Sequence, residues 1–253
     1  MSSGDTKTFK ISIAHTIIEI ECFYDTIITL CKDYIVHSGK PDFLVRTSLE
    51  EIIARRREVP KSEREIPGVA FRYADEALEP FVVHQKIVEG LISFDTLLLH
   101  GATIATNNHA YIITAPSGVG KSTRAKIWLE TYPDSFIVNG DKPLIKITDN
   151  EIFACGTPWC GDEGWNTNIM VPLRAIFLLE RADEGEESTI KEVSLGKAFP
   201  FLLQQTYRPS DPNLMRETIQ LLKALEGKVK LYRFRSTPTP EAVRLAYETA
   251  CPR

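Results

Sequence analysis

The sequence has no long apolar run and no strong excess of either charge. Among its 253 residues, no apolar stretch reaches the roughly 18 residues of a membrane-spanning helix. The opening residues 1–10 lack the apolar centre of a signal peptide. The formal net charge of −4 gives no indication of nucleic-acid binding. We therefore expect a cytoplasmic protein that binds neither membranes nor nucleic acids.

Cysteines are also few, and their number and spacing argue against a disulfide-stabilised fold and against a structural zinc site. The five cysteines are scattered along the chain, and no C-x-x-C pair occurs. An odd number argues against a framework of disulfides, and Cys155 and Cys160 have no second pair of ligands to complete a zinc site. The cysteines are therefore interpreted as structural or incidental.

No repeat, low-complexity tract or clear linker divides the chain. The sequence therefore predicts one domain over residues 1–253, with a β-rich portion over 1–92 and a nucleotide- and acceptor-binding portion over 93–253. In the first portion, alternating apolar residues predict two strands within 9–22. The same portion carries a short helix capped by Ser48, a turn and strand over 65–74, and helical spacing over 79–96.

The pattern is clearer from Leu97 onward, where strands alternate with a few helices. Strands are predicted over 97–106, 110–114, 135–141, 174–180 and 228–234, and a hairpin over 143–155. Helices are predicted over 121–132, over 211–227 with Asp211 as its cap, and over 239–250 with Thr239 as its cap. The fold class expected from this order is mixed α/β.

A glycine-rich stretch lies between the strand over 110–114 and the helix that follows it. It matches the phosphate-binding pattern G-x-x-x-x-G-K-S/T, with Ala115 in place of the first glycine. Glycines allow backbone amides to converge on phosphate oxygens, and the helix directs its positive end at the same anion. The predicted nucleotide-binding residues are Ser117, Gly118, Val119, Gly120, Lys121, Ser122 and Thr123. Lys121 would contact the β- and γ-phosphates, and Ser122 a Mg²⁺ ion.

Residues around this stretch carry a resemblance to a known group of proteins. His100-Gly101, the loop from Ala115 to Ser122, and the "NGD" of 139–141 are similar in order to the HPr kinase/phosphorylase family and the related PEP carboxykinases. The resemblance covers roughly residues 97–147. It implies a twisted, mostly mixed β-core with the glycine loop between strands and helices outside. It also implies an ATP- and Mg²⁺-dependent phosphotransferase, of the small stand-alone kind.

One position departs from the family pattern. HPr kinases have two adjacent aspartates where this chain has Gly140 and Asp141. The resemblance implies that Asp141 engages the acceptor hydroxyl or the metal, and that His100 orients Asp141 or the acceptor. A plain turn residue remains an alternative interpretation for Asp141.

The stretch of residues 156–168 combines turn residues with two of the three tryptophans. Loops seldom carry so much apolar surface unless it packs or binds something. Two interpretations remain open: the loop anchors itself in the core, or it forms a wall of the acceptor pocket. In the second case the pocket residues would be Trp159, Glu163, Trp165, Asn166 and Asn168.

Several arginines are candidates for stabilising phosphate charge. Arg124, near the start of the helix that follows the glycine loop, could approach a phosphate. The other possible charge stabilisers are Arg174, Arg181, Arg208 and Arg216.

The predicted function is a kinase that transfers the γ-phosphoryl group of ATP to a hydroxyl. The acceptor is a small molecule or a serine in a peptide or protein, and the sequence fixes neither the acceptor nor the oligomeric state. The alternative is a nucleotide-binding or sensing module in which Gly140 impairs catalysis. Other chemistry on this scaffold is less favoured, since PEP carboxykinases are much longer than 253 residues. HPr is not favoured as acceptor, because the first 90 residues do not match the N-terminal domain of typical HPr kinases.

Overall fold

The computed structural model describes residues 6–58, 74–183 and 185–251. The chain divides into two compact units, Met1–Leu91 and Ile92–Arg253. The expectation of one domain over 1–253 stays a prediction, and the strand expected over 65–74 lies outside the described residues except for Ala74.

The N-terminal unit is built on three strands. Strands β1 (Lys7–Ile13) and β2 (Thr16–Cys22) form the predicted antiparallel pair, and β3 (Phe43–Arg46) lies parallel to β2. The helical elements are α1 (Asp25–Leu30), the 3-10 turn η1 (Lys32–Tyr34), α2 (Leu49–Glu58) and α4 (Asp75–Ile92). The Ser48 hydroxyl accepts from the Glu51 amide at 3.3 Å, and the Glu51 carboxylate accepts from the Ser48 amide at 2.9 Å. This reciprocal pair confirms the predicted cap.

The prediction of a β-rich N-terminal portion is wrong for the described residues. Helices α2 and α4 have 10 and 18 residues, against 7, 7 and 4 in the strands. Leu78, Val82 and Leu91 are buried at helical spacing along α4. The fully buried Glu79 carboxylate accepts from the amides of Phe23 and Tyr24, each at 2.9 Å, which ties α4 to the end of β2.

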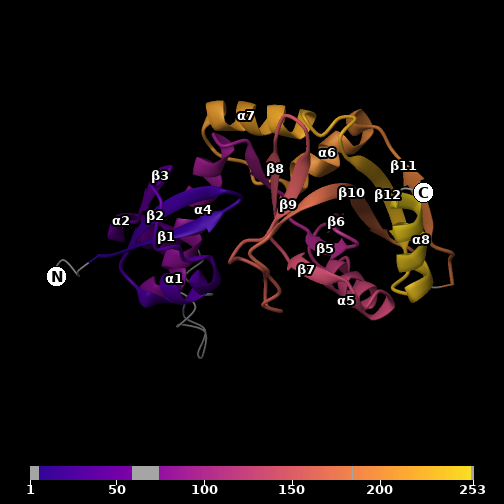
Figure 1. Ribbon diagram of the computed structural model, residues 1–253, viewed down its shortest axis with the longest axis horizontal. Coiled ribbons are helices and arrows are strands. Elements are labelled where there is room, and N and C mark those ends of the chain that lie inside the picture. Colours follow the sequence, from indigo (N-terminus) through magenta and orange to yellow (C-terminus); the bar gives the residue numbers. More distant parts are fainter. Residues whose placement is uncertain (1–5, 59–73, 184, 252–253) are drawn as a thin grey trace. The chain divides into compact units, whose positions relative to one another are not determined.

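The C-terminal unit contains one curled, mixed sheet of nine strands (Figure 1). The order is β4-β8-β9-β10-β6-β5-β7, and β12 pairs with β10 and with β11. Strands β6, β10 and β12 are parallel, while the remaining pairs are antiparallel. The bounds are β4 (Thr96–Leu98), β5 (Ala102–Thr106), β6 (His109–Thr114), β7 (Phe136–Asn139), β8 (Leu144–Ile147), β9 (Ile152–Cys155), β10 (Met170–Arg181), β11 (Thr189–Glu192) and β12 (Lys230–Ser236).

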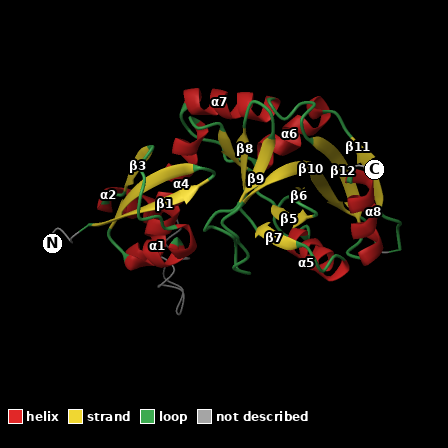
Figure 2. Ribbon diagram, in the orientation of Figure 1, coloured by secondary structure: helices red, strands yellow, loops and turns green. Residues whose placement is uncertain are grey.

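Helices cover both faces of this sheet (Figure 2). Helices α5 (Lys121–Thr131) and α8 (Pro240–Ala250) pack on one face, and α6 (Leu195–Gln205) and α7 (Pro212–Lys223) on the other. Strand β10 is buried on both sides, because Phe177 belongs to the core with α5 while Leu178 belongs to the core with α6. This confirms the strand predicted over 174–180 and the mixed α/β class.

Local signals along the C-terminal unit are largely confirmed. Asn107 and Asn108 have φ of 48° and 60°, which is the left-handed region expected of the turn between β5 and β6. The Thr239 hydroxyl caps α8 through the Ala242 amide. Helix α6 was not predicted, since Pro200 lies inside it. Within the described ranges, no helix is both long and apolar enough to span a membrane.

The cap of α7 gives a test of the fold. Asp211 accepts from the amides of Asn213 and Leu214 at 2.7 and 3.0 Å. Asp211→Ala removes this cap and should cost about 1 kcal/mol of stability, lowering the melting temperature by about 2–4 °C. Asp134→Ala, at an exposed residue, is the control in the same thermal unfolding experiment. Equal melting temperatures for the two variants would contradict the cap.

Candidate functional site

The glycine-rich loop connects strand β6 to helix α5, as the sequence predicts. Gly118 and Gly120 have φ of 80° and 104°, conformations in which a side chain would be strained. Ala115 is fully buried and is absent from the residues with positive φ, so it replaces the first glycine of the pattern without strain. Nothing lies within 4 Å of the position where Gly118 would carry a Cβ, so this part of the loop faces open space.

Lys121 is the first residue of α5, and its side chain turns back under the loop. Its ammonium group donates to the carbonyl oxygens of Ala115 at 3.0 Å and Pro116 at 3.4 Å, and the residue is 7% exposed. Burial lowers the pKa of Lys121, while the negative charge of Asp141 opposes that shift.

Two arginines hold the carbonyl oxygens of the loop. Arg124 donates to the carbonyls of Val119 at 3.4 Å and Gly120 at 3.2 Å, and Arg181 donates to that of Gly118 at 2.8 Å. Arg124 is 2% exposed and also donates to the side chain and carbonyl of Ser236. Arg124 thus braces the loop from inside the core, and its approach to a phosphate stays a prediction.

For the other three candidate arginines, no contact with the glycine loop is recorded among the described residues. Arg174 donates to the Ala250 carbonyl at 3.2 Å and Arg216 to the Asn213 side chain at 3.1 Å, while Arg208 is exposed. Arg181 ends β10, which runs parallel to β6. The carboxyl ends of neighbouring parallel strands meet at one edge of a sheet, which explains why Arg181 reaches the loop that follows β6.

His100 and Asp141 form a pair beside the loop. The Nε2 atom of His100 lies 3.1 Å from Oδ1 of Asp141, and its Nδ1 atom lies 3.2 Å from Oε1 of Gln205. The Thr114 hydroxyl, one residue before the loop, donates to the His100 carbonyl at 2.7 Å. The Gly101 amide donates to the Asp141 carbonyl at 3.0 Å. Residues that are distant in the sequence are therefore joined next to the glycine loop.

The Asp141 carboxylate is held ionised by its neighbours. The hydrogen bond from His100, followed by the hydrogen bond and charge of Lys142, lowers the pKa of Asp141 well below its usual range, although burial opposes this. The Nζ atom of Lys142 lies 2.6 Å from Oδ2 of Asp141. Each carboxylate oxygen therefore has one cationic or hydrogen-bonding partner.

A buried asparagine shapes the turn that carries Asp141. Oδ1 of Asn139 accepts from the amides of Asp141 at 2.9 Å and Lys142 at 2.6 Å. Its Nδ2 atom donates to the carbonyls of Thr157 at 3.0 Å and Trp159 at 3.2 Å. Asn139 makes the side-chain bonds of this turn, so the Asp141 side chain is not used to close it.

Gly140 lies where the loop 156–168 packs against the end of β7. Its amide donates to the Trp165 carbonyl at 2.8 Å, and a Cβ at this position would lie 2.9 Å from the Cys160 carbonyl oxygen. Real Cβ atoms do not approach a backbone oxygen so closely. A second aspartate at 140 would therefore require this loop to move.

The five predicted acceptor residues differ in their exposure and in their contacts. Trp159 is buried, whereas Glu163 and Asn168 are exposed. Trp165 packs against the core with α5, where the Lys126 ammonium lies 5.7 Å from its ring, and Asn166 donates to the Cys160 sulfur at 3.2 Å. None of the five lines either of two pockets that the described residues of this unit form. Their role at an acceptor stays a prediction.

Metal ligands are sparse around the loop. The described part of the chain contains no group of three or more His, Cys, Asp or Glu side chains suited to a metal ion. The two candidate ligands, Ser122 and Asp141, offer one hydroxyl and one carboxylate. These oxygens fit the preference of Mg²⁺, which is usually bound by one or two protein oxygens together with substrate phosphates and water.

Comparisons with known proteins give little beyond this geometry. No family model matches the chain, and no curated protein matches it. Among solved structures, it is similar to the Hpr(Ser) kinase/phosphatase from Coxiella burnetii, with 12% identity over 50% of this chain and 88% of the other, at a TM-score of 0.28. This likeness assigns neither a family nor a function to the chain.

The close approach at Gly140 is directly testable. Gly140→Ala should displace the Cys160 segment and cost about 1–3 kcal/mol of stability, as overpacking does elsewhere. Gly196→Ala is the matched control, because nothing lies within 4 Å of its Cβ position in α6, and it should be neutral or stabilising. Urea unfolding of both variants measures the difference. A Gly140→Ala protein as stable as wild type would show that the loop adapts freely.

Proposed function

We propose that this chain is an ATP- and Mg²⁺-dependent kinase that phosphorylates a hydroxyl of a small molecule or of a serine in a peptide or protein. The observation that carries the proposal is the His100–Asp141 pair, held beside a glycine-rich loop that opens a helix with a lysine. A loop of this kind binds the phosphates of a nucleotide. The neighbouring Asp141 carboxylate then provides an oxygen that accepts a hydrogen bond from the acceptor hydroxyl.

The residues divide the work of phosphoryl transfer between binding and positioning. The amides of the loop and the Lys121 ammonium bind the β- and γ-phosphates, and Ser122 holds Mg²⁺, which supplies charge neutralisation when bound. Asp141 accepts a hydrogen bond from the acceptor hydroxyl and takes its proton as the oxygen attacks the γ-phosphorus and ADP leaves. His100 positions Asp141. A carboxylate with so low a pKa is a weak base, so Asp141 contributes chiefly by orienting the hydroxyl, and in a loose transition state positioning dominates the rate.

A nucleotide-sensing module without transfer activity is the second candidate. It is favoured by the 2.6 Å contact between Lys142 and Oδ2 of Asp141, since an acceptor must displace or share this lysine. The absence of a second acid at Gly140 points the same way. Because a side chain at 140 meets the Cys160 carbonyl, a Gly140→Asp variant does not separate the two candidates cleanly.

The test is production of ADP from Mg-ATP by the whole chain. Pools of hydroxyl-bearing metabolites, amino acids and serine peptides are added in turn, with Lys121→Ala as the blank. A pool that raises ADP above the blank supports the kinase and is then divided to find the acceptor. ATP binding without a rise in any pool supports the sensing module instead. Absence of both binding and turnover contradicts both candidates.

Lys121→Ala should weaken binding of Mg-ATP about ten-fold or more. The variant removes charge-assisted contacts to phosphate, each worth about 1.5–3 kcal/mol. Isothermal titration calorimetry measures the affinity. Lys126→Ala removes an exposed lysine from the same helix and serves as control. Equal affinities of Lys121→Ala and the control would place the nucleotide elsewhere.

Asp141→Asn should keep the affinity for Mg-ATP within a few-fold and lower the transfer rate about a hundred-fold or more. The amide retains the size of the carboxylate but cannot accept a proton. Single-turnover assays with the acceptor identified above measure the rate. Asp162→Asn, at an exposed residue of the neighbouring loop, should behave as wild type. A fully active Asp141→Asn protein would refute the role of Asp141.

A further inference from the structure

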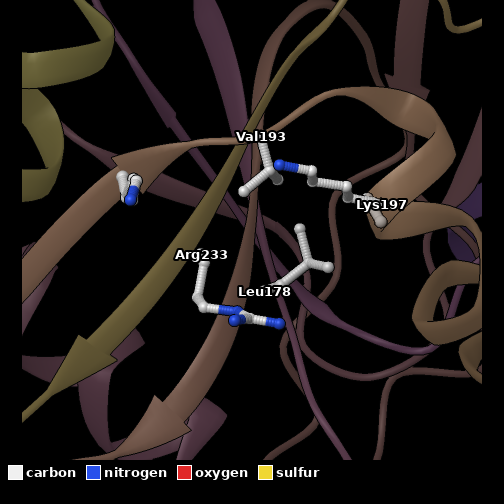
Figure 3. Close-up of a pocket in the computed structure, with 6 residues that line it drawn as sticks. Leu178, Val193, Lys197 and Arg233 are labelled. Atoms are coloured by element: carbon white, nitrogen blue, oxygen red, sulfur yellow. The ribbon is translucent and has the colours of Figure 1, made fainter.

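A basic pocket lies on the sheet face covered by α6, away from the glycine loop. It has a volume of about 140 Å³ and is lined by three apolar residues and three cations, of which Leu178, Val193, Lys197 and Arg233 are labelled in Figure 3. Strands β10, β11 and β12 and the first turn of α6 contribute the lining. The apolar residues are Leu178, Val193 and Ala198, and the cations are Lys191, Lys197 and Arg233.

The positive charge of this basic pocket is only partly balanced. Nε of Arg233 forms an ion pair with Glu180 at 3.0 Å. Within the ranges that the structure describes, no carboxylate lies at ion-pair distance from Lys191 or Lys197, and both lysines are exposed. The dipole of α6 adds partial positive charge at its adjacent N-terminus, where the Ser194 side chain makes no capping bond. Two cations are therefore available to an anionic group.

A row of three residues, paired across neighbouring strands, runs from the pocket towards the candidate site. Leu178 pairs with Arg233 on one side and with Thr114 on the other, and Thr114 holds the carbonyl of His100. Two strand spacings separate Arg233 from Thr114, or about 10 Å. Helix α6 gives an independent estimate, because Lys197 and Gln205 are about 12 Å apart along it, and Gln205 contacts His100.

We propose that the basic pocket binds an acidic side chain of a peptide acceptor. The proposal rests on the kinase function above and names its substrate class: a peptide with Asp or Glu about three to five residues from the phosphorylated hydroxyl. An extended chain of that length spans about 10–18 Å, which covers the two separations estimated above, from Arg233 to Thr114 and from Lys197 to Gln205. The apolar lining residues accommodate the methylene groups of the acidic side chain.

The experiment compares short serine peptides that carry Glu about four residues from the serine with the same peptides carrying Gln. The variant Lys191→Gln/Lys197→Gln removes the two unbalanced cations. The double variant Lys40→Gln/Lys223→Gln removes two exposed lysines elsewhere and is the control. For the Glu peptides, KM should rise about ten-fold in the pocket variant with kcat unchanged, because two charge contacts are lost before the chemical step. The Gln peptides should not distinguish the variants.

A second measurement separates this proposal from the kinase itself. Labelled Glu and Gln peptides with alanine in place of serine are bound to the protein without nucleotide and followed by fluorescence anisotropy. Glu-dependent binding that is lost in the pocket variant supports the pocket even if no peptide is phosphorylated, in which case only the kinase function fails. Phosphorylation with the same KM for Glu and Gln peptides leaves the kinase standing and overturns the pocket. Absence of Glu-dependent binding in the anisotropy experiment overturns it as well.

Discussion

The buried side-chain amide of Asn139 is the interaction on which the candidate site depends. Its oxygen holds the amides of Asp141 and Lys142, and its nitrogen holds the carbonyls of Thr157 and Trp159. One fully buried group thus fixes the turn after β7 and the start of the loop that packs on it. Because all of its hydrogen bonds are internal, losing it would leave buried polar groups unsatisfied at two places at once. This turn positions the backbone of Asp141, while His100 and Lys142 hold its carboxylate.

The cationic side chains around the glycine loop are likewise held by internal hydrogen bonds. The Lys121 ammonium is bonded to two loop carbonyls, and Arg124 and Arg181 hold the carbonyls of residues 118–120. A buried ammonium without such partners would be costly. If the proposed kinase function holds, a bound triphosphate replaces the carbonyl partners of Lys121 with phosphate oxygens, so the lysine exchanges weaker acceptors for charged ones. The neighbouring Asp141 keeps the region from carrying only positive charge.

Local chemistry explains which parts of the structure the sequence predicts. The cap of Asp211, the left-handed Asn107 and Asn108, and the order of strand, glycine loop and helix all depend on neighbouring residues, and the structure has each of them. Contacts between distant segments leave no such local signal. Gln205 reaches His100 from a helix that contains Pro200, and the close approach at Gly140 comes from a loop some twenty residues away. Helices α2 and α4 of the N-terminal unit coincide with stretches of predicted helical spacing, so only the description of this portion as β-rich is wrong.

The most direct test of the proposed nucleotide site is a crystal structure of the whole chain with Mg²⁺ and a non-hydrolysable ATP analogue. We expect the β- and γ-phosphates against the amides of residues 118–122, with the Lys121 ammonium turned from the Ala115 and Pro116 carbonyls toward them. We also expect the γ-phosphate to face Asp141. A nucleotide bound away from this loop, or a γ-phosphate directed away from Asp141, would contradict the proposed site.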